Sequence, residues 1–190
     1  MPETKIVGEN EYGLSDAAIL SERWLSATTL PDVLARPAVI TAAVEQPSPV
    51  LRRVVIRKQG PAVFVEVYAN RPMSPTFLKS VEAVADLLSL PPGWNSYSAS
   101  SIDHENARQA IRLLAEFLKP SMLPPSVVPT VRGGIQLEWH ARGVNVEIYI
   151  ESPNAVSFFA EEAGIGKSPD VPLSGHEREL SSWLERISGK

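Results

Sequence analysis

The sequence predicts an α+β protein, with an antiparallel β-sheet made of a hairpin plus a three-stranded meander and with helices packed on one face. Segments in which apolar and polar residues alternate with period two are joined by short turns, as in antiparallel strands. Other segments carry apolar residues at helical spacing. Their order along the chain is two strands, two helices, three strands and a final helix, which is typical of the α+β class.

The composition is that of an ordinary folded protein. Of 190 residues, 44% are apolar and 21% charged, the formal net charge is −4, and there is no cysteine. These values exclude a chain too polar to fold, and the lack of cysteine excludes disulfides and thiolate chemistry. No window approaches the roughly 18 apolar residues of a membrane span, and the first ten residues lack the apolar core of a secretory signal. We therefore expect a cytoplasmic protein with no membrane partner.

The chain divides into an N-terminal arm and one main domain. Residues 1–49 combine an amphipathic stretch with several prolines, and we interpret them as a helical or irregular arm. Residues 50–190 form a single α+β domain that ends in an amphipathic helix at 175–188. The arm is a candidate docking element, including for a homodimer.

Residues 50–70 are predicted to form the first hairpin, with its turn at 59–62. Alternation places Arg53 and Arg57 on the face away from the core, beside Tyr68. Arginines next to an aromatic ring are used for phosphate contacts and base stacking, so nucleic-acid binding through the basic hairpin at 52–58 is one alternative function. Charged residues also protect a sheet edge from pairing with another chain, and the acidic net charge favours this second interpretation.

Capping residues mark three helices in the domain. Ser74 followed by Pro75 begins the first, and Asp103 begins the second, which Pro120 ends. Ser174 and Glu177 have the spacing of a capping box at the start of the last helix. We expect loops between these elements at 93–101, 120–129 and 163–173.

A second hairpin is predicted at 135–141 and 144–151, followed by a third strand at 156–160. A two-residue turn at Arg142–Gly143 turns six apolar side chains to one face, and a register error of one residue would expose them all. The six residues are Ile135, Leu137, Trp139, Val146, Ile148 and Ile150.

The opposite face of this hairpin carries the most enzyme-like group of residues. The predicted register sets Glu138 opposite Glu147, with His140 two residues along the same strand. Two opposed carboxylates can share a proton or a divalent metal, so a metal-dependent hydrolase or nuclease is an alternative function. The plainer interpretation is a solvated sheet face, because no further acidic ligand is placed locally to complete a metal shell.

Two motifs resemble those of a group of small uncharacterised bacterial proteins. Residues 90–99 read LPPGWNSYSA and residues 128–139 read VPTVRGGIQLEW, and the resembling proteins carry a GWDGYGA loop and a GGIQLEW strand. The resemblance covers about half of the chain, roughly residues 78–160, and implies no established activity. This sequence has Asn95 where the loop has an acid, and Ser96 and Ser98 where it has glycines, which puts an ion-binding role for the loop in doubt.

The first motif supplies candidate binding residues. Trp94 and Tyr97 combine large apolar rings with polar groups, and Asn95 can bond its own backbone to hold a turn. In one interpretation the two rings plug the end of the core between the helices. In the other, Trp94, Asn95 and Tyr97 bind a ligand or peptide.

Because the sequence shows no clear catalytic motif, we expect the protein to be a non-enzymatic protein-interaction or regulatory module, such as an antitoxin-like, immunity or defence-associated protein. No nucleophile motif, zinc spacing or phosphate loop is present, so we expect no cofactor and no metal. The last helix carries Trp183, Leu184 and Ile187 on one apolar face. That face either packs on its own sheet or enters a groove of a partner protein.

Overall fold

The computed structural model describes residues 51–59, 62–70, 72–163 and 166–188, so the predicted arm at 1–49 lies outside the described residues. The α+β class with antiparallel sheets is confirmed. The elements in chain order are β1 (Leu51–Gln59), β2 (Ala62–Ala69), α1 (Pro75–Leu87), α2 (His104–Phe117), β3 (Ser126–Pro129), β4 (Ile135–Ala141), β5 (Val144–Ser152), β6 (Ala155–Glu162), β7 (Gly166–Pro172) and α3 (Glu177–Ser188).

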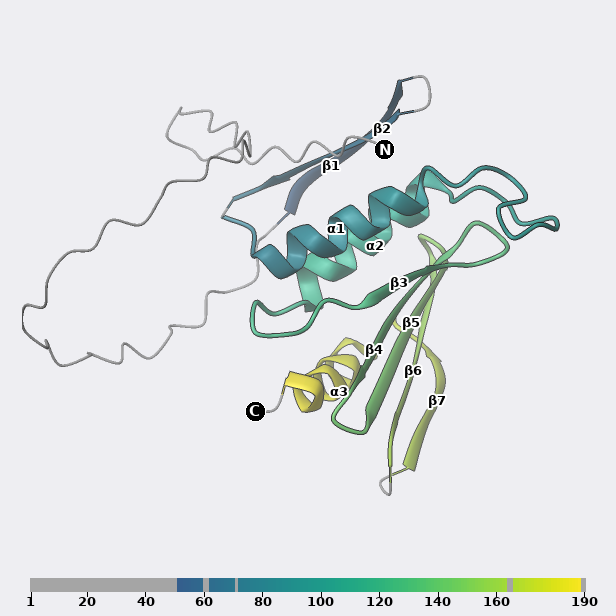
Figure 1. Cartoon of the computed structure of the whole chain (residues 1–190). Coiled ribbons are helices and arrows are strands. Elements are labelled where there is room, and N and C mark those ends of the chain that lie inside the picture. Colours follow the sequence, from purple (N-terminus) through teal and green to yellow (C-terminus); the bar gives the residue numbers. More distant parts are fainter. Residues whose placement is uncertain (1–50, 60–61, 71, 164–165, 189–190) are drawn as a thin grey trace, which may run out of the picture.

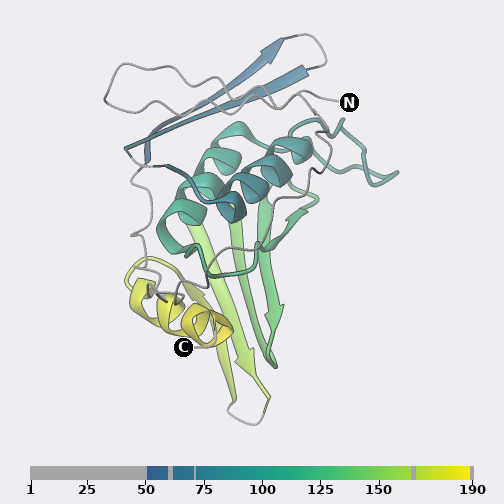
Figure 2. The ribbon, with the colours of Figure 1, turned by 60° about the vertical axis from the view of Figure 1, so that its left-hand side comes forward.

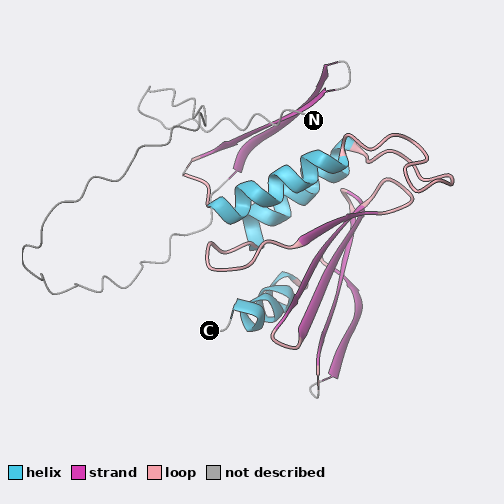
Figure 3. Cartoon of the chain, in the orientation of Figure 1, coloured by secondary structure: helices cyan, strands magenta, loops and turns pink. Residues whose placement is uncertain are grey.

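The described elements form layers. β1 and β2 make a separate two-stranded sheet, and β3 to β7 make a five-stranded meander in which chain neighbours pair. Helices α1 and α2 lie between the hairpin and the larger sheet (Figures 1 and 2), and α3 lies beside that sheet (Figure 3). Apolar side chains from both sheets and all three helices join in one buried cluster.

The two central helices begin at the residues that the sequence predicts. The Ser74 hydroxyl accepts a hydrogen bond from the Phe77 N–H at 3.1 Å. The Asp103 carboxylate accepts from the N–H groups of Glu105 and Asn106 at 2.7 and 3.3 Å. These three bonds satisfy amides that a helix leaves unpaired in its first turn, which is why Ser74 and Asp103 fix the two starts.

The predicted register of the β4–β5 hairpin is confirmed in every pair. Arg142 and Gly143 adopt positive φ angles of 58° and 77°, as a two-residue hairpin turn requires. Each apolar partner on the predicted inner face is at most 3% exposed. The three pairs are Ile135 with Ile150, Leu137 with Ile148, and Trp139 with Val146.

The meander has five strands where the sequence analysis predicted three. The segments at 120–129 and 163–173, predicted as loops, contain β3 and β7, which pair with β4 and β6. Both are edge strands in the five-stranded order, and both contain proline. Proline lacks a backbone donor and is tolerated at an edge, where one side of the strand has no neighbour. The prolines therefore indicated edges of the sheet, not the end of strand structure.

The last helix begins later than predicted. Gly175 has a φ of +87°, which is outside the helical region, and α3 starts at Glu177. The Glu177 carboxylate accepts from the Gly175 N–H at 3.1 Å, and the capping box with Ser174 is not formed. The apolar face of α3 packs on its own sheet, with Leu184 and Ile187 2% and 5% exposed.

Candidate functional site

The loop between α1 and α2, here called the tip loop (residues 91–101), is closed by hydrogen bonds. The Gly93 N–H donates to the Ala99 carbonyl at 2.7 Å, and Gly93 has a φ of +75°. The Asn95 side-chain oxygen accepts from the N–H groups of Tyr97 and Ala99 at 3.0 and 3.3 Å. The prediction that Asn95 holds the turn through its own backbone is thus confirmed.

Ser96 in this loop has the left-handed φ of 66°. Glycine adopts this conformation without the steric penalty that a Cβ atom brings. Ser96 therefore carries backbone strain that a glycine would avoid.

The tip loop is joined to the turn between β3 and β4, residues 130–134, which carries the second motif. The Ser100 N–H donates to the Val131 carbonyl at 2.9 Å, and the Asp103 N–H donates to the Gly133 carbonyl at 3.0 Å. A Cβ atom on Gly133 would lie 2.6 Å from the Ser101 carbonyl oxygen, so only glycine permits this approach. The two motifs, about 30 residues apart in the sequence, form one site.

Asn106, which is 4% exposed, ties the second motif to α2. Its side-chain amide donates to the carbonyls of Gly133 and Glu151 at 3.0 and 3.2 Å. Its side-chain oxygen has no hydrogen-bond donor among the described residues. Because this amide bonds one carbonyl of the turn and one of β5, it holds the turn against both the helix and the sheet.

Large apolar side chains are exposed at this end of the molecule. Tyr97 is 86% exposed and Val131 is 57% exposed, whereas Trp94 is half-buried and donates from its indole N–H to the Ser100 carbonyl at 3.2 Å. We call Trp94, Tyr97 and Val131 the tip surface. The loops that carry it project beyond the ends of α1 and α2 in Figure 1.

The interpretation in which Tyr97 plugs the end of the core is wrong. Its ring lies in solvent, because hydrogen bonds to Asn95 and along the backbone close the loop without any packing of that ring.

The polar face of the β4–β5 hairpin carries Glu138, His140 and Glu147 as predicted, with His140 bonded to Glu138 and Glu147 bonded to other side chains. The His140 ring makes hydrogen bonds through Nδ1 to the Asn145 oxygen at 3.1 Å and through Nε2 to the Glu138 carboxylate at 3.4 Å. These bonds, first with Asn145 and then with Glu138, raise the pKa of His140 above its ordinary value, although burial opposes the shift. His140 is therefore held between a neutral amide and a carboxylate, both of which favour its protonated form.

Glu147 has its own two donors on this face. Its carboxylate accepts from the Gln136 amide at 3.0 Å and, at a short distance, from the Tyr149 hydroxyl. Burial and the bond to Glu147 raise the pKa of Tyr149 above its ordinary value. Among the residues that the structure describes, no three histidine or acidic side chains are grouped so that they could hold a metal ion.

The basic hairpin places its arginines as predicted. Arg53 is opposite Tyr68 and Arg57 is opposite Phe64 in the β1–β2 ladder. The Arg57 guanidinium lies 3.6 Å from the Glu66 carboxylate, so an acid on the same face offsets one of the two charges offered to a phosphate.

Two of the three candidate residues on α3 are buried within the domain. Leu184 and Ile187 contact the core cluster, which is the self-packing alternative for this helix. Trp183 is half-buried, and the Arg186 guanidinium carbon lies 4.4 Å from the centroid of its ring. Arg186 also donates to the Glu162 carboxylate at 2.7 Å, which fixes this cation over the indole.

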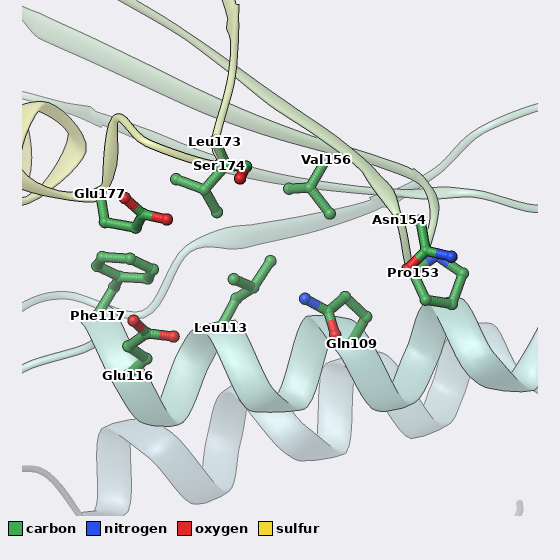
Figure 4. Close-up of a pocket in the computed structure, with 10 residues that line it drawn as sticks. All are labelled: Gln109, Leu113, Glu116, Phe117, Pro153, Asn154, Val156, Leu173, Ser174 and Glu177. Carbon is green, nitrogen blue, oxygen red and sulfur yellow. The ribbon is translucent and has the colours of Figure 1, made fainter.

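Sequence reasoning missed a hollow of about 360 Å³ between α2, the β5–β6 turn and the start of α3. Figure 4 shows side chains from all three segments facing it, including Leu113, Asn154 and Glu177. The helical spacing of Leu113 and Phe117 was visible in the sequence, but nothing there indicated that residues near 154 and 174 lie opposite them.

The comparisons with known proteins identify no relative. No family model, no curated protein and no solved structure matches this chain. In the part of the chain that the structure describes, no helix has the length and apolar character needed to cross a membrane.

Proposed function

We propose that this protein is a non-enzymatic interaction module that binds a protein partner in the cytoplasm through its tip surface. The observation that carries this proposal is that Tyr97 is 86% exposed on a backbone closed by hydrogen bonds. A ring presented in this way loses little conformational freedom when a partner covers it.

The residue types at the tip surface are those that dominate binding energy in protein interfaces. Tyrosine and tryptophan bring large apolar area with few rotatable bonds, and they are enriched among the residues whose truncation weakens complexes most. Trp94 and Tyr97 lie on one short loop, with Val131 on the adjoining turn. A pocket on the partner that accepts Tyr97 would also bury part of the neighbouring apolar surface.

The other candidate sites offer less to a partner. On the polar face of β4 and β5, the side chains of Glu138, His140 and Glu147 already bond one another or their neighbours. On the basic hairpin, Glu66 offsets the charge of Arg57. These pairings favour the tip surface over the hydrolase and nucleic-acid alternatives.

The test is recovery of a companion protein from the cells that produce this chain. We expect an affinity-tagged wild-type chain to retain a companion in stoichiometric amount, and Tyr97→Ala to lose most of it. Leu123→Ala is the matched control, because Leu123 is another exposed apolar residue, at 67%, and lies outside the tip loop. Retention that is equal in wild type and Tyr97→Ala would overturn the proposal, provided that both unfold at the same urea concentration.

The same experiment distinguishes the kinds of partner that the sequence predicts. A second copy of this chain would appear as a dimer in sedimentation equilibrium of the purified protein, and Tyr97→Ala would dissociate it. A different protein would be identified by its mass, which would also test the narrower hypothesis of an antitoxin-like, immunity or defence-associated role.

A further inference from the structure

An elongated groove runs from the C-terminal half of α2 along the first turns of α3. It consists of two adjoining hollows of about 360 and 340 Å³, and Glu116, Phe117 and Glu177 line both of them. The second hollow continues along α3 past Ser181 and Glu185. The groove is therefore longer than either hollow alone, and it follows the helix axis.

Apolar side chains line one part of the first hollow, here called the floor of the groove. Leu113, Phe117 and Leu173 line the first hollow and belong to the buried core cluster, and Val156 packs against that cluster from β6. In Figure 4 the Phe117 ring and the Leu113 side chain face the space between α2 and the segment at 173–177. Hydrocarbon of an occupant would therefore be removed from water on contact with this floor.

Two carboxylates flank the aromatic ring on this floor. Figure 4 shows Glu177 on one side of the Phe117 ring and Glu116 on the other. Within the described ranges neither Glu116 nor Glu177 has an ion pair, and the Glu177 carboxylate accepts hydrogen bonds from the backbone N–H groups of Gly175 and of Glu177 itself. Its backbone bonds hold the pKa of the Glu177 carboxyl below its ordinary value, so it is charged at neutral pH. Carboxylates and an aromatic face both attract a cation.

The remaining charges along the groove leave it acidic. Glu185 accepts from the Lys119 ammonium at 2.9 Å, and this pair is neutral as a unit. Arg178 is the one cationic residue among those that line the two described hollows, and it lines only the second, whereas the acids Glu116 and Glu177 line both. The complementary occupant therefore carries positive charge.

We propose that this groove binds a basic, amphipathic peptide segment of a protein partner, with an arginine or lysine side chain seated between Glu116 and Glu177 against Phe117. A linear segment fits two hollows in line better than a compact small molecule does. Its apolar residues lie on the floor, and its cations meet the acids of the rim. The groove is distinct from the tip surface, which lies at the N-terminal end of α2, so this proposal stands without the proposed function.

A fluorescence-anisotropy titration tests this proposal with a labelled ten-residue peptide of alternating arginine and leucine. The double variant Glu116→Gln with Glu177→Gln keeps the acceptor for the Gly175 N–H and removes two charges at the groove. We expect its dissociation constant to rise by about tenfold or more, the size expected when close charge pairs are lost. The matched control, Glu138→Gln with Glu147→Gln, makes the same charge change on the polar sheet face, and we expect it to stay within about twofold.

Two outcomes would overturn the proposal. Equal weakening in both double variants would show that the peptide responds to net charge and not to the groove. Binding of free arginine ethyl ester as tightly as the peptide, with the same loss in the groove variant, would show a site for small cations instead of a peptide groove.

Discussion

The tip surface and the polar face of the β4–β5 hairpin hold their candidate residues in opposite ways. On the sheet face, polar side chains bond to one another: His140 with Asn145 and Glu138, and Glu147 with its own neighbours. At the tip, the backbone and Asn95 make the bonds, and the ring of Tyr97 is left 86% exposed. On the sheet face the polar side chains already have hydrogen-bond partners, whereas the tip surface leaves apolar area in water.

This difference separates a structural pattern from a binding surface. A polar sheet face in water is common and its groups are satisfied by neighbours and solvent, so a cluster of acids and a histidine there needs no ligand. A large apolar ring is held in water on a fixed loop at the tip, and a partner that covers this ring would remove apolar area from water, which lowers the free energy.

The largest expected effect concerns the support of the tip. Gly133→Ala would set a Cβ atom 2.6 Å from the Ser101 carbonyl in a left-handed conformation. We expect a loss of about 3 kcal/mol in the free energy of unfolding, because the backbone is strained and the close contact between the turn at 130–134 and the tip loop is disrupted.

Gly143→Ala is the control for Gly133→Ala, because Gly143 has a φ of +77° but no atom within 4 Å of the added methyl. Only conformational strain applies there, and we expect a loss of about 1 kcal/mol. Urea unfolding measures both variants. Equal losses would contradict the close approach that joins the tip loop to the turn.

The next effect concerns Asn106. Asn106→Ala removes both donors to the carbonyls of Gly133 and Glu151 inside the protein, and we expect a loss of about 2 kcal/mol by urea unfolding. Ser89→Ala removes one bond to the Asp86 carbonyl at an exposed position, and it should change stability by less than about 0.5 kcal/mol. A loss at Asn106 no larger than at Ser89 would show that the amide does not hold the turn.

The parts of the fold that the sequence predicted are those where two independent constraints agree. At β4 and β5, turn length and alternation each determine the register, so the pairing was predicted in every residue. The edge strands β3 and β7 were missed because their prolines signal a loop as readily as an edge. The start of α3 was misplaced because a capping-box pattern does not reveal that Gly175 has a positive φ.

The candidate site was predicted only in part. Residues Trp94, Asn95 and Tyr97 were identified from the sequence, and so was the turn that Asn95 holds. The exposure of Tyr97 was not predicted, because the position of its loop also depends on contacts with a turn more than thirty residues away, such as the bond from Ser100 to Val131. The groove between α2 and α3 was missed for the same reason, since its walls come from distant segments.

The smallest effect concerns the polar sheet face. Asn145→Ala and Glu138→Gln should each lower the pKa of His140, because the bond with Asn145 and the bond with and charge of Glu138 all raise it. A proton resonance titration of the imidazole ring measures both. An unchanged pKa in Asn145→Ala would contradict the pairing.

The bonds of His140 also make the free energy of unfolding depend on pH. A raised pKa means that the folded state binds the His140 proton more tightly than the unfolded state, whose pKa is about 6.5. The stabilisation is therefore fully present below that pH and is lost as the pH rises through the folded-state pKa. Asn145→Ala should flatten this part of the urea-unfolding profile measured against pH.

Amide hydrogen exchange of the tip loop tests most directly whether an exposed ring is held on a fixed backbone. The N–H groups of Gly93, Tyr97, Ala99 and Ser100 all donate hydrogen bonds. We predict that they exchange at least about tenfold more slowly than in an unstructured peptide, and that Asn95→Ala removes the protection of Tyr97 and Ala99. Exchange of all four at the unstructured rate in the wild-type chain would contradict the account.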